Sequence, residues 1–265
     1  MDVLLFLAPA MVLSILLVGI HSYLGLHVLK REVLFVDISL SQVAVLGAVI
    51  ALFFFDEHNK AAQTAFSLIS CISVALLLSW LKQHEKKIPQ EAIIGVTYAA
   101  ASGFLILFLD RLPHGAEHLK EALVGNILFV TWEQVLITFI VYSVIGLIHW
   151  YFRKYFWDVT NGKIKSFLWD FLFYVLFGVV ITFSTQHAGV LVVFSILVIP
   201  AAIGIRMFSD LRAQLFSAWG IGIISAFFSF LLSYKIDLPS GPMIVAVLSV
   251  VFFSYLIGLI CLKRT

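Results

Sequence analysis

Charged residues are scarce in this sequence and make up only 12% of its 265 residues. The longest interval between apolar stretches, 110–134, is about 25 residues, so little of the chain remains for a soluble domain. Cysteine is scarce as well: Cys71 and Cys261 both lie inside apolar stretches, so no disulfide framework is implied. The net charge of +2 at pH 7 gives no reason to expect nucleic-acid binding.

Motifs for enzyme chemistry are also missing. The sequence has no GxxxxGKS or GxxxxGKT phosphate loop, and the NGK at 161–163 does not make one, so we expect this chain to bind no nucleotide. It has no GxSG or HExxH motif and no paired aspartates at membrane depth, which argues against an intramembrane enzyme. A purely structural membrane subunit stays open at this point.

Apolar residues dominate the chain instead, because 62% of it is hydrophobic. A helix needs about 20 apolar residues to cross roughly 30 Å of hydrocarbon, where only helices and closed barrels satisfy their own backbone polar groups. The sequence therefore predicts an all-α, polytopic membrane bundle that forms one transmembrane domain over residues 1–265. The predicted spans are 3–26, 38–55, 61–81, 92–109, 135–152, 164–185, 188–205, 213–234 and 242–262.

The number of spans depends on one joint, because only Gln186 and His187 separate the sixth stretch from the seventh. If these two stretches form one bent helix, the bundle has eight spans instead of nine. Lysine and arginine gather in alternate gaps, with thirteen in one set and four in the other. Since cytoplasmic loops carry the excess of these residues, nine spans place the N-terminus outside and the C-terminus in the cytoplasm. The thirteen are Lys30, Arg31, Lys82, Lys86, Lys87, Arg153, Lys154, Lys163, Lys165, Arg206, Arg212, Lys263 and Arg264.

Five strings, in this order along the chain, resemble those of one transporter family. They are FVDISLSQVAVLGAVIA (35–51), EAIIGVTYAA (91–100), LVGNILFVTWEQV (123–135), GVLVVFSILVIPAA (189–202) and DLPSGPMIVAV (237–247). They are similar to strings in the permease subunits of the zinc/manganese/iron ABC importer family, and the similarity extends over most of the chain.

The resemblance implies a type II ABC importer-like permease that crosses the cell (inner) membrane many times. Its implied partners are an ATP-binding cassette subunit on the cytoplasmic side, an external solute-binding protein and a second permease copy, in a homodimer or a heterodimer. The expected function is import of a divalent transition metal ion, zinc or manganese, by alternating access, with ATP hydrolysed by the partner and no cofactor bound by this chain. The alternative is a related permease for a non-metal solute or an iron chelate.

The segment 197–214 combines a helix-breaking proline with small residues and flanking charges. This pattern indicates either a short helix on the cytoplasmic membrane surface or a tight turn between two spanning helices. By similarity to the family, this segment would dock on the ATPase. The residues assigned to that coupling role are Pro200, Ala201, Ala202, Gly204 and Arg206.

The second apolar stretch carries candidate ligands for the transported ion. The family often has an Asp and a His four residues apart here, but alignment on LSQVAVLG places Gln42 at the His position and Ile38 at the Asp position. Asp37 is displaced by one residue, and it lies about 140° from Gln42 around a straight helix. Asp37 is predicted to be either a helix N-cap or a carboxylate that lines the path. Gln42 either lines the path or bonds a neighbouring helix.

A second set of candidates lies in the predicted external gap, in the string PHGAEHLKE at 113–121. His114, Glu117 and His118 have the spacing that places side chains on one face of a helix, with Pro113 in its first turn. Two imidazoles and a carboxylate form a plausible ligand set for a zinc-type ion. A solvated helix, a docking surface for the binding protein and a pH-sensitive gate are the other interpretations.

Overall fold

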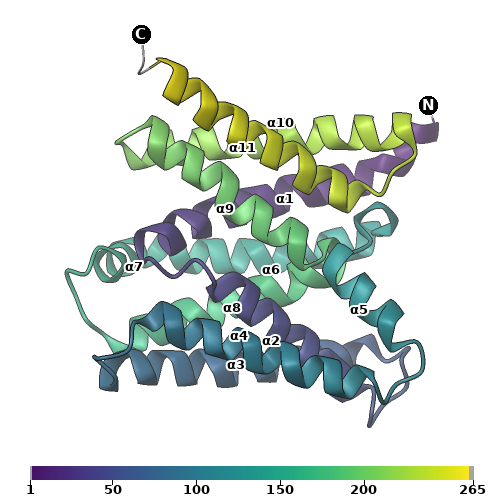
Figure 1. The fold of residues 1–265 in the computed structure, drawn as a ribbon, viewed down its shortest axis with the longest axis horizontal. Helices are drawn as coiled ribbons and strands as arrows, with labels where there is room; N and C mark the ends of the chain where they lie inside the picture. The colour runs from purple at the N-terminus through teal and green to yellow at the C-terminus, as the bar shows by residue number, and fades with distance from the viewer. Residues whose placement is uncertain (1, 263–265) are drawn as a thin grey trace. The chain divides into compact units, whose positions relative to one another are not determined.

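The computed structural model describes residues 2–262, and over that range the chain contains helices and no strand (Figure 1). The basic residues Lys263 and Arg264 lie outside the described residues. The predicted all-α fold is confirmed. The helices are α1 (Asp2–Lys30), α2 (Val36–Ala51), α3 (Lys60–His84), α4 (Gln90–Leu109), α5 (Gly115–Val124), the 3-10 helix η1 (Ile127–Phe129), α6 (Trp132–Tyr151), α7 (Arg153–Thr160), α8 (Phe167–Ala188), α9 (Val190–Met207), α10 (Leu211–Ile236) and α11 (Ser240–Leu262).

Eight of the described helices are long and apolar enough to cross a membrane. The second predicted stretch, 38–55, is not a full-length helix, because α2 has only 16 residues and is about 24 Å long. The predicted stretches on either side of Gln186 and His187 are two separate helices. The break between α8 and α9 is Gly189, whose φ of 77° suits glycine. The count of eight rests on helix length and composition alone and leaves out the shorter apolar helix α2, whereas the joint at 186–187 connects two separate helices.

The chain groups into two compact units. Unit 1 comprises Met1–Leu29, Val124–Ile140 and His187–Thr265, and unit 2 comprises Lys30–Leu123 and Val141–Gln186. The chain passes from one unit to the other four times, once at the end of α1 and once within α6. Because neither unit is continuous in sequence, neither corresponds to a separate segment of the chain.

In unit 1, α1 packs closely against α9 and α10. A Cβ atom at Gly25 would lie 2.1 Å from the carbonyl oxygen of Leu197, so only glycine permits this approach of α1 to α9. The indole Nε1 of Trp219 on α10 donates a hydrogen bond of 3.0 Å to the carbonyl oxygen of Gly19. Small residues and polar side chains at such contacts are typical of helix packing in membranes, where lipid removes the hydrophobic drive for association.

In unit 2, α2 packs against α3 by the same means. A Cβ atom at Gly47 would lie 2.6 Å from the carbonyl oxygen of Phe66, and the Ser67 hydroxyl donates a hydrogen bond of 2.7 Å to the carbonyl oxygen of Ala44. This close contact holds α2 in a fixed position along α3.

Helices α3 and α8 of unit 2 meet at both of their ends. Lys82 Nζ lies 2.8 Å from Asp170 Oδ1 at one end, and Gln186 Nε2 lies 3.1 Å from Thr64 Oγ1 at the other. The low-numbered end of one helix therefore meets the high-numbered end of the other, so the two helices run antiparallel.

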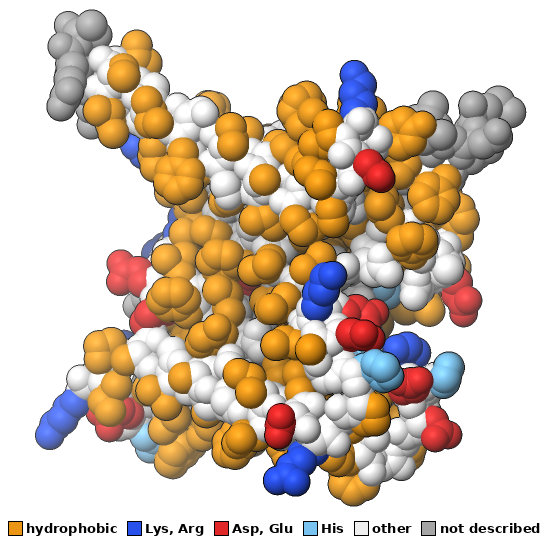
Figure 2. Space-filling model, turned by 45° about the vertical axis from the view of Figure 1, so that its right-hand side comes forward, with side chains coloured by type: hydrophobic (Ala, Val, Ile, Leu, Met, Phe, Trp, Pro, Cys, Tyr) orange, Lys and Arg blue, Asp and Glu red, His pale blue; other side chains and the backbone are white. Residues whose placement is uncertain are grey.

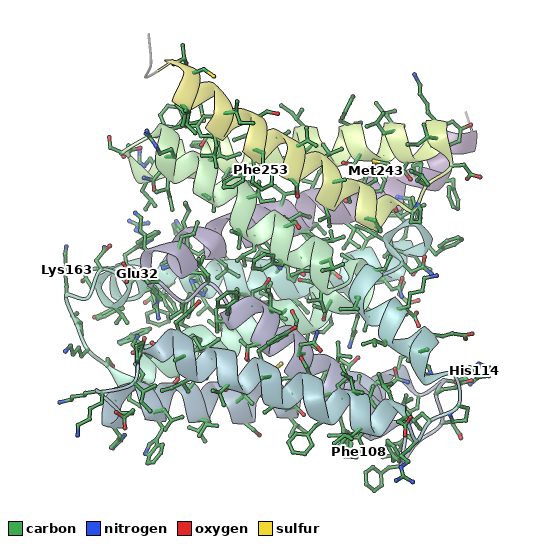
Figure 3. All side chains as sticks on the ribbon, viewed as in Figure 1. Glu32, Phe108, His114, Lys163, Met243 and Phe253 are labelled. Carbon is green, nitrogen blue, oxygen red and sulfur yellow. The ribbon has the colours of Figure 1, made fainter. Side chains whose placement is uncertain are left out.

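The gaps that the sequence assigns to opposite sides of the membrane lie at opposite ends of unit 2. Glu32 and Lys163, which lie in gaps predicted to be cytoplasmic, are at one end of the unit, and His114 in a predicted external gap is at the other (Figure 3).

The close approach at Gly25 makes a specific prediction. Gly25→Ala is expected to lower the free energy of unfolding by about 2 kcal/mol, because the new methyl group overlaps the backbone of α9. Gly19→Ala on the same helix is the control, since nothing lies within 4 Å of its Cβ position and alanine favours a helix by up to ~1 kcal/mol. Thermal unfolding of the purified protein in detergent measures both changes. Equal melting temperatures for the two variants would contradict the packing described.

Candidate functional site

Asp37 lies in the first turn of α2 and is completely buried. It is not the N-cap: that position is Phe35, which makes no side-chain cap bond, so the interpretation of Asp37 as a cap is wrong. Glu91 of α4 takes over part of the capping, because its Oε1 accepts a hydrogen bond of 3.1 Å from the Phe35 backbone N–H. Both carboxylate oxygens of Asp37 are buried without a hydrogen-bond partner among the described residues.

The oxygen atoms near Asp37 differ from those that the sequence pattern suggested. Ser41 is one helical turn from Asp37 and on the same face of α2, whereas Gln42 lies about 140° away around the helix. Ser41 is fully buried, and its hydroxyl has no hydrogen-bond partner in the described part of the chain. Gln42 is also buried. The structure therefore groups Asp37 with Ser41, a residue that the family comparison did not single out.

The three candidates at the predicted external gap are only partly brought together. Helix α5 begins at Gly115, so His114 and Pro113 precede it, and His114 has a φ of 56°. His114 Nδ1 lies 3.5 Å from Glu117 Oε2, and both side chains are well exposed. Among residues 2–262, no three His, Cys, Asp or Glu side chains gather so that they could hold a metal ion. A ligand role for His114, Glu117 and His118 stays a prediction.

A buried ion cluster in unit 2 was not expected from the sequence. Asp170 Oδ1 lies 2.9 Å from Arg31 Nη1 and 2.8 Å from Lys82 Nζ. The side chains of Arg31 and Asp170 are 3% and 4% exposed. Arg31 Nε also donates a hydrogen bond of 2.9 Å to Thr160 Oγ1 at the end of α7. The cluster thus joins the α1–α2 connection to α3, α7 and α8.

Arg31 keeps its charge although it is buried. Burial lowers the pKa of its guanidinium group, and the neighbouring Tyr174 and Asp170 act in the opposite direction. Arginine has such a high ordinary pKa that it stays protonated in proteins. The guanidinium carbon also lies 3.9 Å from the ring centroid of Phe173, a cation–π contact.

The predicted coupling segment is a tight turn and not a helix on the membrane surface. Helix α9 continues through Pro200 to Met207, and α10 begins at Leu211. Pro200, Ala201 and Gly204 are buried inside α9, Ala202 is half-buried, and only Arg206 of the predicted set is exposed. Residues 207–210 are exposed as well. The side chain of Asp210 ends the turn by accepting hydrogen bonds from the first backbone N–H groups of α10.

The surface of the molecule indicates its surroundings. Hydrophobic side chains cover much of the face shown in Figure 2, and charged side chains there are few. Exposed large apolar residues are found on most of the long helices, including α3, α4, α6, α10 and α11. A soluble protein rarely exposes so much apolar surface, whereas a lipid-facing helix must.

The fold and this surface define a polytopic helical membrane protein. The chain matches the family model of the ABC 3 transport family over residues 4–258, and it belongs to that family. The resemblance inferred from the five strings is confirmed.

The chain is similar to several proteins of this kind. A membrane protein from Cyanophora paradoxa, described as uncharacterized and encoded in the ycf23-apcF intergenic region, is 28% identical over 71% of this chain, and the match spans 65% of that protein. The manganese transport system membrane protein MntC of Listeria monocytogenes is 23% identical over 94% of this chain and 89% of its own length. The solved structure of PsaBC from Streptococcus pneumoniae in complex with Fab has a TM-score of 0.76 at 19% identity, with 94% of this chain and 90% of that chain covered.

The buried ion cluster predicts a large loss of stability when its acid is removed. Asp170→Asn is expected to destabilise the protein by about 3 kcal/mol, because Arg31 and Lys82 then share no carboxylate and Arg31 is buried. Asp158→Asn is the control: its one ion pair among the described residues joins it to the exposed Lys163 at a long 3.9 Å, so its loss should cost less than about 1 kcal/mol. Melting temperatures in detergent compare the two. If the cluster did not stabilise the fold, the two variants would lower the melting temperature equally.

Proposed function

We propose that this chain is the permease subunit of an ABC importer that moves manganese into the cytoplasm. The observation that carries the proposal is the buried carboxylate of Asp37, whose two oxygens have no hydrogen-bond partner among the described residues. Burying a charged group without a partner costs several kcal/mol, so such groups are usually neutralised or meet a cation. A cation that passes along α2 would supply the missing partner.

The donor atoms support manganese over zinc. The two buried, unpartnered groups on this face of α2 offer a carboxylate and a hydroxyl, both oxygen donors, and Gln42 stands where the family often has His. Oxygen ligands suit manganese, whereas zinc prefers imidazole and thiolate. The name of the Listeria relative, a manganese transport protein, agrees with this choice.

The partners follow from the family. An ATP-binding cassette subunit would hydrolyse ATP and dock at the exposed turn from Arg206 to Asp210, which is the accessible part of the predicted coupling segment. A solute-binding protein would deliver the ion to an external mouth near 110–121. A second permease copy would complete the path. Because Asp37 is fully buried, ions could reach it only when the packing around α2 changes, as alternating access requires.

Asp37→Asn separates a role in transport from a role in stability. Uptake of radioactive manganese by cells is expected to fall at least about tenfold, because the amide lacks the charge that attracts the ion. The melting temperature is expected to stay the same or rise, because a buried carboxylate without a partner is replaced by a neutral group.

Asp56→Asn is the matched control, since Asp56 is an exposed residue in the connection between α2 and α3 and its loss should leave uptake unchanged. The level of each variant in the membrane is measured by immunoblot. Full manganese uptake with Asp37→Asn would rule out the path-lining role. Wild-type cells that take up an iron chelate or an organic solute, and no manganese, would favour the alternative substrate class.

The exposed group at α5 is tested by the triple alanine substitution of His114, Glu117 and His118. If these residues capture the ion or dock its binding protein, the apparent KM for manganese uptake should rise roughly threefold or more with the maximal rate unchanged, because exposed ligands act on capture. Uptake is measured at limiting and at saturating manganese. An unchanged rate at limiting manganese would make these residues part of a solvated surface only.

A further inference from the structure

Helix α7 and its flanking residues in unit 2 carry a dense group of cations and exposed aromatic rings. We define the α7 surface by six residues: Trp150, Tyr151, Arg153, Lys154, Lys163 and Lys165. All six are exposed, and Trp150 and Tyr151 expose 64% and 75% of their surface. The position of Lys163 is labelled in Figure 3.

The opposite face of α7 is fixed to the rest of unit 2. Phe156 is completely buried and stacks on His149 of α6 with 4.0 Å between ring centroids. Thr160 accepts the hydrogen bond from Arg31, and the Lys30 ammonium lies 4.9 Å from the ring centroid of Trp157. Because this face is held by the ion cluster and by aromatic packing, the cations of the α7 surface face away from the unit.

Most of the positive charges of the α7 surface have no acidic partner within their own segment. The segment 150–170 contains four cations and two acids. One acid, Asp170, is buried and already contacts Arg31 and Lys82. The other, Asp158, lies 3.9 Å from Lys163. Three cations therefore have no acidic partner within this segment.

The aromatic residues indicate the depth at which these cations lie. Helix α6 has 20 residues, the length that crosses the hydrocarbon core, and it ends at Tyr151. Exposed Trp and Tyr at the end of such a helix lie at the level of the lipid headgroups. Tyr155 continues this belt by stacking on Trp169, with 4.7 Å between ring centroids. Arg153 and Lys154 follow Tyr151 after one residue, Phe152, so their charges lie at the level of the phosphates.

We propose that the α7 surface binds the phosphate groups of anionic phospholipids in the leaflet that the lysine and arginine distribution predicts to be cytoplasmic. Exposed apolar side chains between the cations support a lipid partner: Ile164 and Leu168 are 41% and 63% exposed and would meet the acyl chains. A surface that faced only water would not gain from exposing these side chains. Basic groups beside a spanning helix attract anionic headgroups, and salt weakens this attraction.

The test uses the full chain reconstituted in phosphatidylcholine vesicles with a trace of spin-labelled phosphatidylglycerol or phosphatidylcholine. The spectrum gives the relative affinity of the protein for the two lipids. The wild type is expected to prefer phosphatidylglycerol, and the preference should fall at high salt. The variant R153Q/K154Q/K163Q/K165Q is expected to lower the preference at least about threefold, because four cations at the phosphate level are lost.

The matched control is K86Q/K87Q/R206Q/R212Q, which removes four cations from other gaps of the same predicted face. It should change the preference by less than about a third of the effect of the first variant. Equal losses in the two variants would show a general attraction of the basic face and overturn the proposal. An unchanged lipid preference, with weaker binding of the ATPase subunit, would identify the α7 surface as a protein docking site instead.

A second measurement on the wild type does not depend on the folding of a variant. A photoreactive phosphatidylglycerol analogue in the same vesicles is expected to label peptides within 150–169, and excess unlabelled phosphatidylglycerol should reduce this labelling more than phosphatidylcholine does. Labelling that is distributed over all the spanning helices without this competition would contradict the proposal.

Discussion

The contact of Asp170 with Arg31 and Lys82 fixes which helices of unit 2 meet. Asp170 is the only acidic residue of α8, and its cations come from the α1–α2 connection and from α3. Apolar helices in lipid gain little by hiding apolar surface from one another, so small residues and polar contacts determine their neighbours. The same cluster holds Thr160 at the end of α7, and that bond keeps the basic face of α7 pointing away from the unit.

Two buried carboxylates in unit 2, those of Asp170 and Asp37, differ in whether they have partners. Asp170 contacts two cations, whereas both oxygens of Asp37 are buried without a hydrogen-bond partner among the described residues. The first arrangement stabilises the fold, because removing the acid would leave buried positive charge. The second costs stability, and a chain retains such a group where it serves a ligand. Under the proposed function Asp37 would serve the transported ion, although among the described residues it belongs to no group of three possible metal ligands.

The sequence was sufficient for the helical class, the family and most helix positions, because long apolar stretches and ordered motifs are local signals. It was not sufficient for features that depend on contacts between residues far apart in the sequence. The length of α2, the burial of Pro200 inside α9 and the capping of α2 by Glu91 depend on neighbours that lie far away in sequence. The partners of Asp170 were missed for the same reason, since Arg31 is 139 residues away. An acidic residue alone in an apolar helix is the sequence signal that indicates cationic partners from distant segments.

The junction of α8 and α9 is a single residue, Gly189, with a positive φ. Its neighbour Ala188 is so close to Gly125 that a Cβ atom there would lie 2.1 Å from the Ala188 carbonyl carbon. No loop separates α8 from α9 at this junction. An epitope tag or a protease site inserted at 189 would therefore force the two helix ends apart. The gap at 161–166, which is exposed over most of its length, is one place where unit 2 can accept inserted residues.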